Sequence, residues 1–187
     1  MKRSGFKGLI AAGVVATGVL ASSSVVAASD MFLKIDGVRG ESTDEKHKGE
    51  IDVLSWSWGE SNGAAQTRRG AVPSACIQDL SLMKNTDSST PTLIVNGVVG
   101  QIAPTAVLVV RKSGGDSPLE YLRLTMRNVS VSSFQTGGSV GAGDLLNESV
   151  TLHFESMQGE YQQQGPDGRP LGPPITWDIT GGSAGCR

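Results

Sequence analysis

The side chains that could carry chemistry are few in this chain of 187 residues. Two histidines and two cysteines are too few for an ordinary four-ligand zinc site with anything left over. His47 lies in a run of charged residues, which usually forms a solvated turn, and His153 alternates outward on an expected strand. The sequence has no Gly-x-Ser-x-Gly nucleophile elbow and no phosphate-binding glycine loop. It therefore predicts no catalytic centre, no metal site and no cofactor.

Composition and charge exclude further classes of function. The 16 basic and 18 acidic residues give a net charge of −2, so there is no basic surface for nucleic acid. With 18% charged and 38% hydrophobic residues, the chain is neither a charged disordered protein nor a membrane bundle. Its 25 glycines indicate many turns, and hence β structure rather than long helices.

The first 28 residues have the order of a secretory signal peptide. Three positive residues precede an uncharged apolar run over 9–20, and small residues follow up to Ala27 and Ala28. The apolar run is short of the roughly 20 residues that a membrane span needs, which favours cleavage after Ala27 or Ala28 over an uncleaved anchor. We therefore expect residues 29–187 to be one secreted or periplasmic domain, without membrane attachment after cleavage and with a flexible C-terminal tail.

Export changes the meaning of the two cysteines. Cys76 and Cys186 both follow the signal segment, and an exported chain meets an oxidising compartment. Two cysteines allow one internal pair, so a Cys76–Cys186 disulfide is favoured, with two free thiols as the alternative.

The exported part is expected to consist of short strands. Apolar residues alternate with polar ones, or run continuously, in about seven or eight segments between glycine-rich turns, which is typical of a small barrel or a sandwich. The clearest segments are 31–35, 51–58, 76–83, 106–110, 121–131, 150–154 and 175–179.

One strand changes face along its length. The larger residues of 51–58 begin at odd positions and end at Trp56 and Trp58, and a bulge would allow this change. Strand alternation places Ser55 and Ser57 opposite the two tryptophans. Because the tryptophans belong in a core, we expect both serines to face outward.

One short helix is also expected. Thr90 is a suitable cap, Pro91 suits the first helical position, and Leu93, Ile94 and Val98 are candidates to pack inward. Two glycines nearby each cost about 1 kcal/mol in a helix relative to alanine, so the helix should be short or frayed.

Several motifs in order carry a family resemblance. They are DMFLKIDG (30–37), KHKGEIDVLSWSWG (46–59), VRKSGG (110–115), SSFQTGGS (132–139) and WDI (177–179). The segment from 30 to 179 resembles the Hcp family, the haemolysin-coregulated tube proteins of bacterial type VI secretion. The resemblance implies a small β-barrel with one helix and a long early loop, without enzymatic activity or cofactor. It further implies six-membered rings that stack into a tube with spike, sheath and small effector proteins as partners, and Ser55 and Ser57 would then face the lumen.

The signal segment leaves a second interpretation open, because typical members of that family lack one. The chain could be an exported Hcp-like module that binds a partner in the periplasm or outside the cell. In a ring, Arg68 and Arg69 of the long loop would need acceptors, for which Asp44, Glu45 and Glu50 of a neighbouring subunit are candidates.

Overall fold

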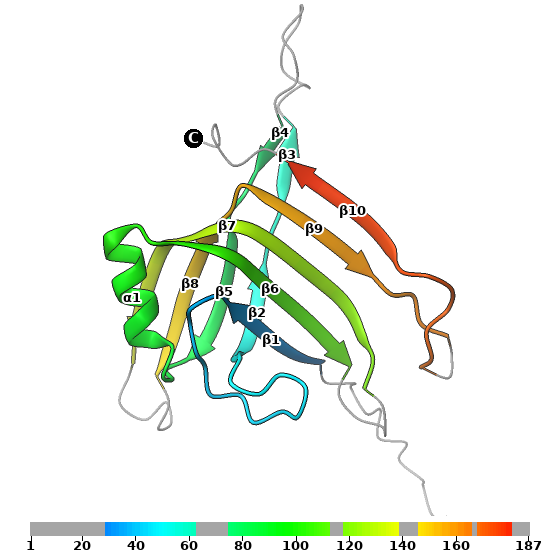
Figure 1. Cartoon of the computed structure of the whole chain (residues 1–187), viewed down its shortest axis with the longest axis horizontal. Helices are drawn as coiled ribbons and strands as arrows, with labels where there is room; N and C mark the ends of the chain where they lie inside the picture. The colour runs from blue at the N-terminus through cyan, green and yellow to red at the C-terminus, as the bar shows by residue number, and fades with distance from the viewer. Residues whose placement is uncertain (1–28, 63–74, 113–117, 139–145, 166–167, 181–187) are drawn as a thin grey trace, which may run out of the picture.

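The computed structural model describes residues 29–62, 75–112, 118–138, 146–165 and 168–180 (Figure 1). These residues form ten strands and one helix: β1 (Ser29–Ile35), β2 (Ile51–Ser57), β3 (Glu60–Asn62), β4 (Ala75–Ile77), β5 (Leu80–Asn85), α1 (Thr90–Val99), β6 (Ile102–Lys112), β7 (Glu120–Gly137), β8 (Asn147–His153), β9 (Ser156–Tyr161) and β10 (Ile175–Thr180).

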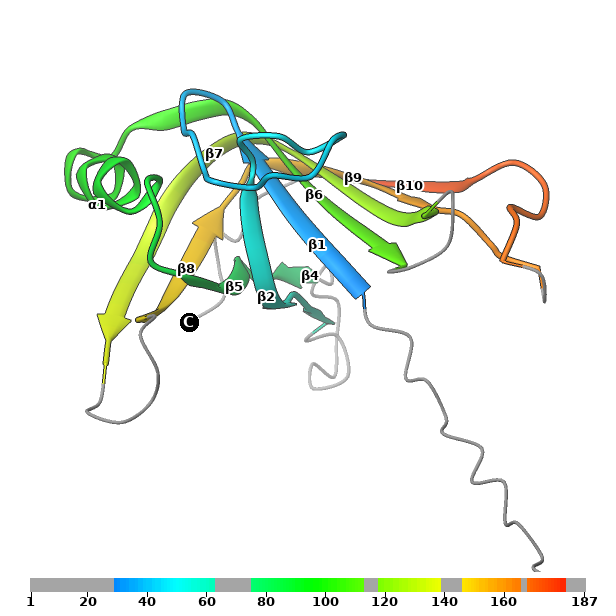
Figure 2. The same ribbon diagram turned by 90° about the horizontal axis from the view of Figure 1, so that it is seen from below.

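Six of the strands close into an antiparallel barrel. The main sheet has the order β10-β9-β7-β6-β1-β2-β5-β8, and β8 also pairs with β7. The long strand β7 takes part in two structures, because its residues 130–137 pair with β8 whereas its residues 122–127 pair with β9. Strands β9 and β10, which we call the flap, therefore continue the sheet beyond the barrel (Figure 2). The predicted small β-barrel with one short helix is confirmed.

The change of face in β2 arises from an irregularity in strand pairing. The register between β2 and β5 shifts between Val53 and Ser55. As a result Ile51 and Val53 are buried before the shift, whereas Trp56 packs against the core after it. The predicted bulge is confirmed, and Ser55 and Ser57 are exposed on the other side of the strand.

The helix begins and packs differently from the expectation. Ser89 occupies the cap position without a side-chain capping bond, and the prediction that Thr90 caps the helix is wrong. Leu93 is buried, but Ile94 and Val98 are exposed, so their predicted inward packing is also wrong. The reason is that Gly97 lies against Val131 of β7, which turns the Leu93 side of the helix toward the barrel.

The flanks of the predicted long loop are ordered into a small ladder. Residues 60–62 of β3 pair with residues 75–77 of β4 in a separate two-stranded sheet, so the two flanks of the long early loop that the resemblance implies are strands. Within the described part of the chain, no helix has the length and apolar character needed to cross a membrane.

Candidate functional site

Small hydroxyl side chains form a row across four strands on the outer face of the barrel. Ser57 of β2 lies opposite Ser81 of β5, which lies opposite Thr151 of β8, which lies opposite Ser133 of β7. Residues in register point to the same side of a sheet, so the four hydroxyls share one face. The Ser81 Oγ and Thr151 Oγ1 atoms are 3.3 Å apart. We call this surface the hydroxyl face.

A second row lies beside the first. Ser55 is opposite Met83, Met83 is opposite Ser149, and Ser149 is opposite Gln135. Neither row contains a charged residue. We include this second row in the hydroxyl face. The face therefore offers hydroxyl groups, one amide and one thioether, without the charges that would hold a charged ligand tightly.

Ser132, Asp79 and His153 form a hydrogen-bonded group at the border of this face, but the order in which they are bonded does not suit catalysis. The Ser132 hydroxyl donates to Asp79 Oδ2 at 2.7 Å, and His153 Nδ1 lies 3.0 Å from Asp79 Oδ1. Nucleophilic catalysis needs the histidine between the serine and the carboxylate, so that the imidazole can take the hydroxyl proton. Here the carboxylate lies between them. His153 is partly exposed on β8, as predicted.

A buried ion pair lies inside the barrel wall that carries the hydroxyl face. Lys84 of β5 and Glu148 of β8 have side-chain exposures of 0% and 1%, and their Nζ and Oε2 atoms are 2.7 Å apart. Lys84 Nζ also lies 2.8 Å from Asp87 Oδ1, and the Thr90 hydroxyl at the start of α1 donates to Glu148. The cluster thus ties the start of the helix to the β5–β8 pair.

The sequence carries a signal for this cluster, although neither charged residue is among the predicted candidates. Along β5, Lys84 alternates in step with the buried Leu80 and Leu82, so its side chain is on their side of the strand. Along β8, Glu148 alternates in step with the buried Val150 and Leu152. Strict alternation therefore places both charges on the core side, in register with each other.

A second charged cluster fixes the loop between β1 and β2 to the barrel. The Arg111 guanidinium donates to Asp44 Oδ2 at 2.6 Å and to Asp30 Oδ2 at 3.0 Å, and it lies over the Phe32 ring. The hydrogen bond from Arg111 is the main cause that lowers the pKa of Asp44 from 3.8 to about 2. The same pairing raises the pKa of Arg111.

His47 belongs to this cluster, and the prediction that it lies in a solvated turn is wrong. Its ring stacks on Phe32 with centroids 4.2 Å apart, and its side chain is buried. Nδ1 lies 2.8 Å from Glu50 Oε2, and Nε2 lies 3.4 Å from Glu120 Oε1. Because Phe32 is on the strand that the charged turn covers, the aromatic stack draws the histidine inward despite its charged neighbours.

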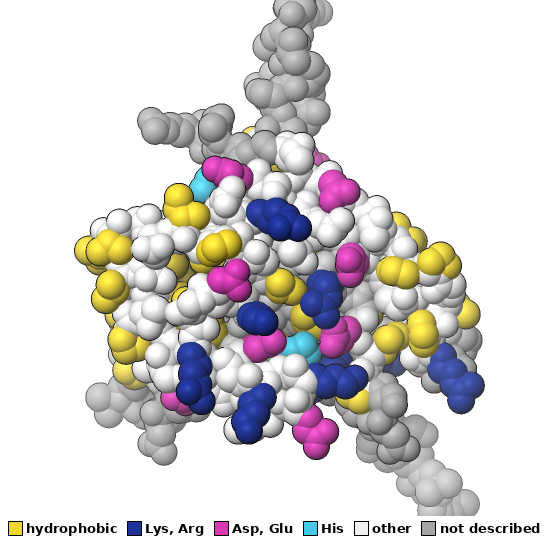
Figure 3. Space-filling model, in the orientation of Figure 1, with side chains coloured by type: hydrophobic (Ala, Val, Ile, Leu, Met, Phe, Trp, Pro, Cys, Tyr) yellow, Lys and Arg dark blue, Asp and Glu magenta, His cyan; other side chains and the backbone are white. Residues whose placement is uncertain are grey.

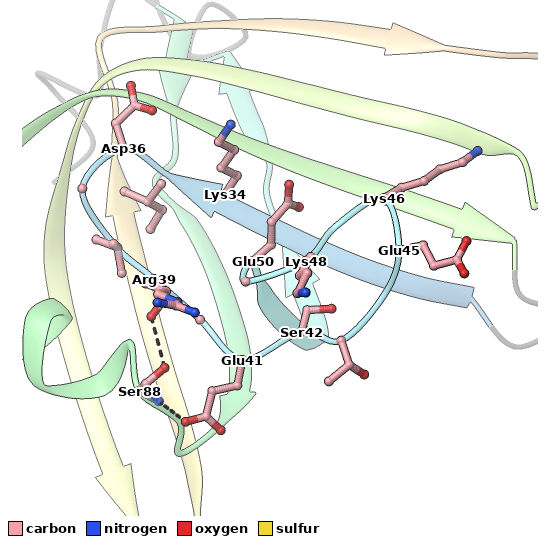
Figure 4. A pocket seen from close by; sticks show the side chains of 16 residues that line it. Lys34, Asp36, Arg39, Glu41, Ser42, Glu45, Lys46, Lys48, Glu50 and Ser88 are labelled. Atoms are coloured by element: carbon pink, nitrogen blue, oxygen red, sulfur yellow. Dashed lines mark hydrogen bonds between the residues drawn. The ribbon is translucent and has the colours of Figure 1, made fainter.

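The same loop encloses an open hollow of about 1440 Å³ above β1 (Figure 4). Four basic and four acidic side chains line it: Lys34, Arg39, Lys46 and Lys48, with Asp36, Glu41, Glu45 and Glu50. The two signs are balanced, so the hollow has no single charge to select a ligand. Within the described ranges, no group of three or more potential ligands could hold a metal ion.

Only three of the five candidate subunit-contact residues lie within the described part of the chain. Asp44 is already bonded to Arg111 and Glu50 to His47 in the same chain, whereas Glu45 is exposed at the hollow. Arg68 and Arg69 lie outside the described residues, as do Cys186, Ala27 and Ala28. Cys76 lies on β4.

Comparison with known proteins shows which family this chain belongs to. A family model described as "Type VI secretion system effector, Hcp" matches residues 32–161. The chain belongs to the Hcp family. It is 46% identical to the protein hcp1 of Pseudomonas aeruginosa over 156 residues, covering 81% of this chain and 96% of that one.

Solved structures of Hcp proteins share this fold. Hcp1 from Salmonella typhimurium is 36% identical with a TM-score of 0.66, covering 82% of this chain and 94% of that one. A structure titled as a type six secretion system protein is 30% identical with a TM-score of 0.75, covering 82% and 96% of the two chains. The chain is therefore an Hcp-type tube component of type VI secretion, a non-enzymatic structural protein of a family whose members are secreted through that system. Membership implies homo-hexameric rings.

Proposed function

We propose that the hydroxyl face lines the lumen of the ring and holds effector cargo during delivery. The observation that carries this proposal is the registered row of Ser57, Ser81, Thr151 and Ser133. A tube that delivers proteins must contact cargo without trapping it. Short uncharged hydroxyls satisfy that requirement, because they make exchangeable hydrogen bonds and carry no net charge.

Cargo retention tests the proposal. Ser57→Gln adds a longer amide to the middle of the row, so we expect it to leave the ring intact and to reduce several-fold the amount of effector that co-purifies with it. Thr176→Gln, at an exposed position of β10, is the matched control and should retain cargo like the original protein. Equal retention by both variants would exclude the hydroxyl face as the cargo surface.

The N-terminal segment supports a second proposal, that residues 1–28 direct export and are cleaved after Ala27 or Ala28. Its support is the order of positive, apolar and small residues. Mass spectrometry of the protein from cells that express the whole sequence tests this. A product that begins at Ala28 or Ser29 outside the cytoplasm supports export, and the alternative role as a periplasmic module would then gain weight. A product that begins at Met1 or Lys2 in the cytoplasm contradicts it.

An exported chain would also form the Cys76–Cys186 disulfide. Its support is that no cysteine within the described residues is a free thiol and that the chain has only two cysteines. A bridge closing so long a loop contributes up to about 4–5 kcal/mol in the chain-entropy model. Alkylation without reduction, followed by mass spectrometry, should find no modified thiol, and two modified thiols would exclude the bridge.

Assembly into rings would bring Arg68 and Arg69 of one subunit near acidic groups of the next. Glu45 is the best supported acceptor of the three candidates, because Asp44 and Glu50 already have partners within the chain. Such an exposed pair contributes about 0–1 kcal/mol and weakens with salt.

A further inference from the structure

The two nitrogens of the buried His47 ring have unequal partners. Nδ1 lies 2.8 Å from Glu50 Oε2 and makes a hydrogen bond with it. Nε2 has no hydrogen-bond partner among the described residues, although Glu120 Oε1 is only 3.4 Å away. Buried polar atoms normally have a partner, so an unpartnered ring nitrogen beside a carboxylate requires an explanation.

The charge state of the ring supplies that explanation. A neutral imidazole carries one N–H group, and the short contact with Glu50 assigns this hydrogen to Nδ1. Nε2 then presents its lone pair to the lone pairs of Glu120, and no hydrogen bond can form between them. A second proton would occupy Nε2, so that each nitrogen would donate to a carboxylate that already lies beside it. Charge-assisted hydrogen bonds of this kind are stronger than neutral ones.

The two carboxylates belong to different parts of the fold. Glu50 is the last residue of the loop between β1 and β2, which we call the charged loop, and Glu120 is the first residue of β7. The backbone N–H of Glu50 donates to the His47 carbonyl at 3.0 Å, so the ring and its first acceptor belong to one turn. This turn forms part of the wall of the hollow above β1. An imidazolium bonded to both carboxylates would therefore tie the wall of the hollow to the main sheet.

Charged side chains lie around the ring on every element packed against it. Besides Glu50 and Glu120, they are Asp30 and Lys34 of β1, Asp44 and Lys46 of the charged loop, Arg111 of β6 and Arg123 of β7. Each arginine is already matched by a carboxylate at 2.6 Å, and both lysines are exposed, where water screens their charge. Figure 3 shows basic and acidic side chains interspersed over this part of the surface, with a histidine among them.

We propose that His47 is a clamp, controlled by protonation, that fastens the charged loop to β7. The neutral ring bonds to Glu50 alone, within its own loop, whereas the doubly protonated ring bonds to Glu50 and Glu120 together. Because the bridged form holds the additional proton, falling pH favours it and rising pH releases it. Histidine side chains ordinarily change charge between about pH 5 and pH 8. The charged loop should therefore be held more firmly at the acid end of that interval.

Amide hydrogen exchange of the full-length protein at about pH 5 and about pH 8 tests the clamp, with rates corrected for the pH dependence of chemical exchange. The backbone N–H groups of Gly40, Ser42, Gly49 and Glu50 are hydrogen-bonded within the charged loop, so their exchange reports its opening. We expect their protection to be severalfold higher at the lower pH. The amides of β5 and β8 are the internal reference and should show equal protection at both.

Matched variants separate the clamp from other groups that titrate. Glu120→Gln removes the second carboxylate at nearly constant size, so the charged loop should have the same protection at both pH values. His47→Gln removes the titrating ring and should also lose the response. Arg123→Gln removes the other partner of Glu120, and His153→Gln replaces the chain's other histidine. Both of these control variants should keep the severalfold response.

The outcomes decide the proposal without reference to cargo. Equal protection of the charged loop at both pH values in the original protein would overturn the clamp, as would an undiminished response in Glu120→Gln. A response that disappears in His153→Gln would also overturn it. The Arg111–Asp44 pair cannot imitate the response, because the pKa of Asp44 is about 2. Thermal melting establishes that each variant is folded, and Glu120→Gln, at a side chain that is 26% exposed, decides the matter if His47→Gln does not fold.

Discussion

The two ends of the long strand β7 belong to very different surroundings. At one end residues 130–137 of β7 pair with β8 and close the barrel, whose interior holds Leu80, Met126 and Leu152 without exposure. At the other end β7 continues into the flap, where the same side of the sheet ends in the exposed Tyr161 and Ile175.

This difference separates the part of the sheet that stabilises the fold from the part that lies mostly in water. Burial of apolar area is the main stabilising contribution to a fold, and most of the core side chains lie on the strands of the barrel. The flap contributes Met157 to the core and packs Trp177 and Ile179 against it, but its outer end displays the exposed Tyr161 and Ile175, and one edge of β10 pairs with no described strand. Changes in the barrel should therefore act strongly on the free energy of unfolding, whereas changes at the exposed end of the flap should alter it little.

The largest effect is expected at the buried ion pair. Lys84→Ala leaves Glu148 as an unpaired charge inside the barrel, which costs about 3–5 kcal/mol of unfolding free energy. Urea denaturation measures this change. Lys34→Ala, which removes an exposed lysine from β1, is the control and should cost less than about 0.5 kcal/mol. Similar effects from both changes would refute the special role of the pair.

A somewhat smaller effect is expected at Trp56. Trp56→Ala removes a partly buried indole that packs against the core, so a loss of about 2–4 kcal/mol is expected. The adjacent Ser57→Gln change is on the outer face and should stay within about 0.5 kcal/mol. If the two variants melted at the same temperature, the assignment of inner and outer faces on β2 would be wrong.

The Asp44 carboxylate should give a pH-dependent effect. Its pKa is lowered from 3.8 to about 2 by Arg111, so its contribution is complete above pH 3.8 and is lost as pH falls toward 2. Asp44→Asn should cost about 1–2 kcal/mol at neutral pH. Denaturation curves from pH 7 to pH 2 should converge for the two proteins at the acid end, and a constant difference would contradict the ion pair. Glu45→Gln is the exposed control.

The smallest change in stability is expected on the flap. Ile175→Asp replaces a side chain that is mostly in water already, so the unfolding free energy of the single chain should change by less than about 0.5 kcal/mol. Denaturation at a protein concentration low enough to dissociate the original ring provides the comparison. A loss of several kcal/mol would show that the flap belongs to the barrel core after all.

The sequence predicts the barrel better than the charged clusters. Alternation and turn residues identify most strands, and even the bulge in β2 follows from the position of Trp56 and Trp58. The same rule reveals Lys84 and Glu148 once it is applied to charged residues as strictly as to apolar ones. His47 is different, because its burial depends on Phe32, which is distant from it in sequence and contacts it only in the folded chain.

The helix shows a second limit. Its position follows from Pro91 and from Gly100, which ends it at a positive φ of 68°. Which side faces the barrel depends on the close approach of Gly97 to Val131, and no local pattern in the sequence gives that contact. Only Ser55 and Ser57 of the hydroxyl face are predicted from the sequence, since the other members join it through strand register.

Amide hydrogen exchange tests the division between barrel and flap most directly. The measurement compares the original protein with the Ile175→Asp chain, residue by residue. We predict that the amides of β5 and β8 are equally protected in both proteins, whereas those of β10, which pairs with β9 alone among the described strands, are less protected than the barrel amides in both. Protection of β10 equal to that of β5 and β8, or loss of protection throughout the barrel in the variant, would contradict this division.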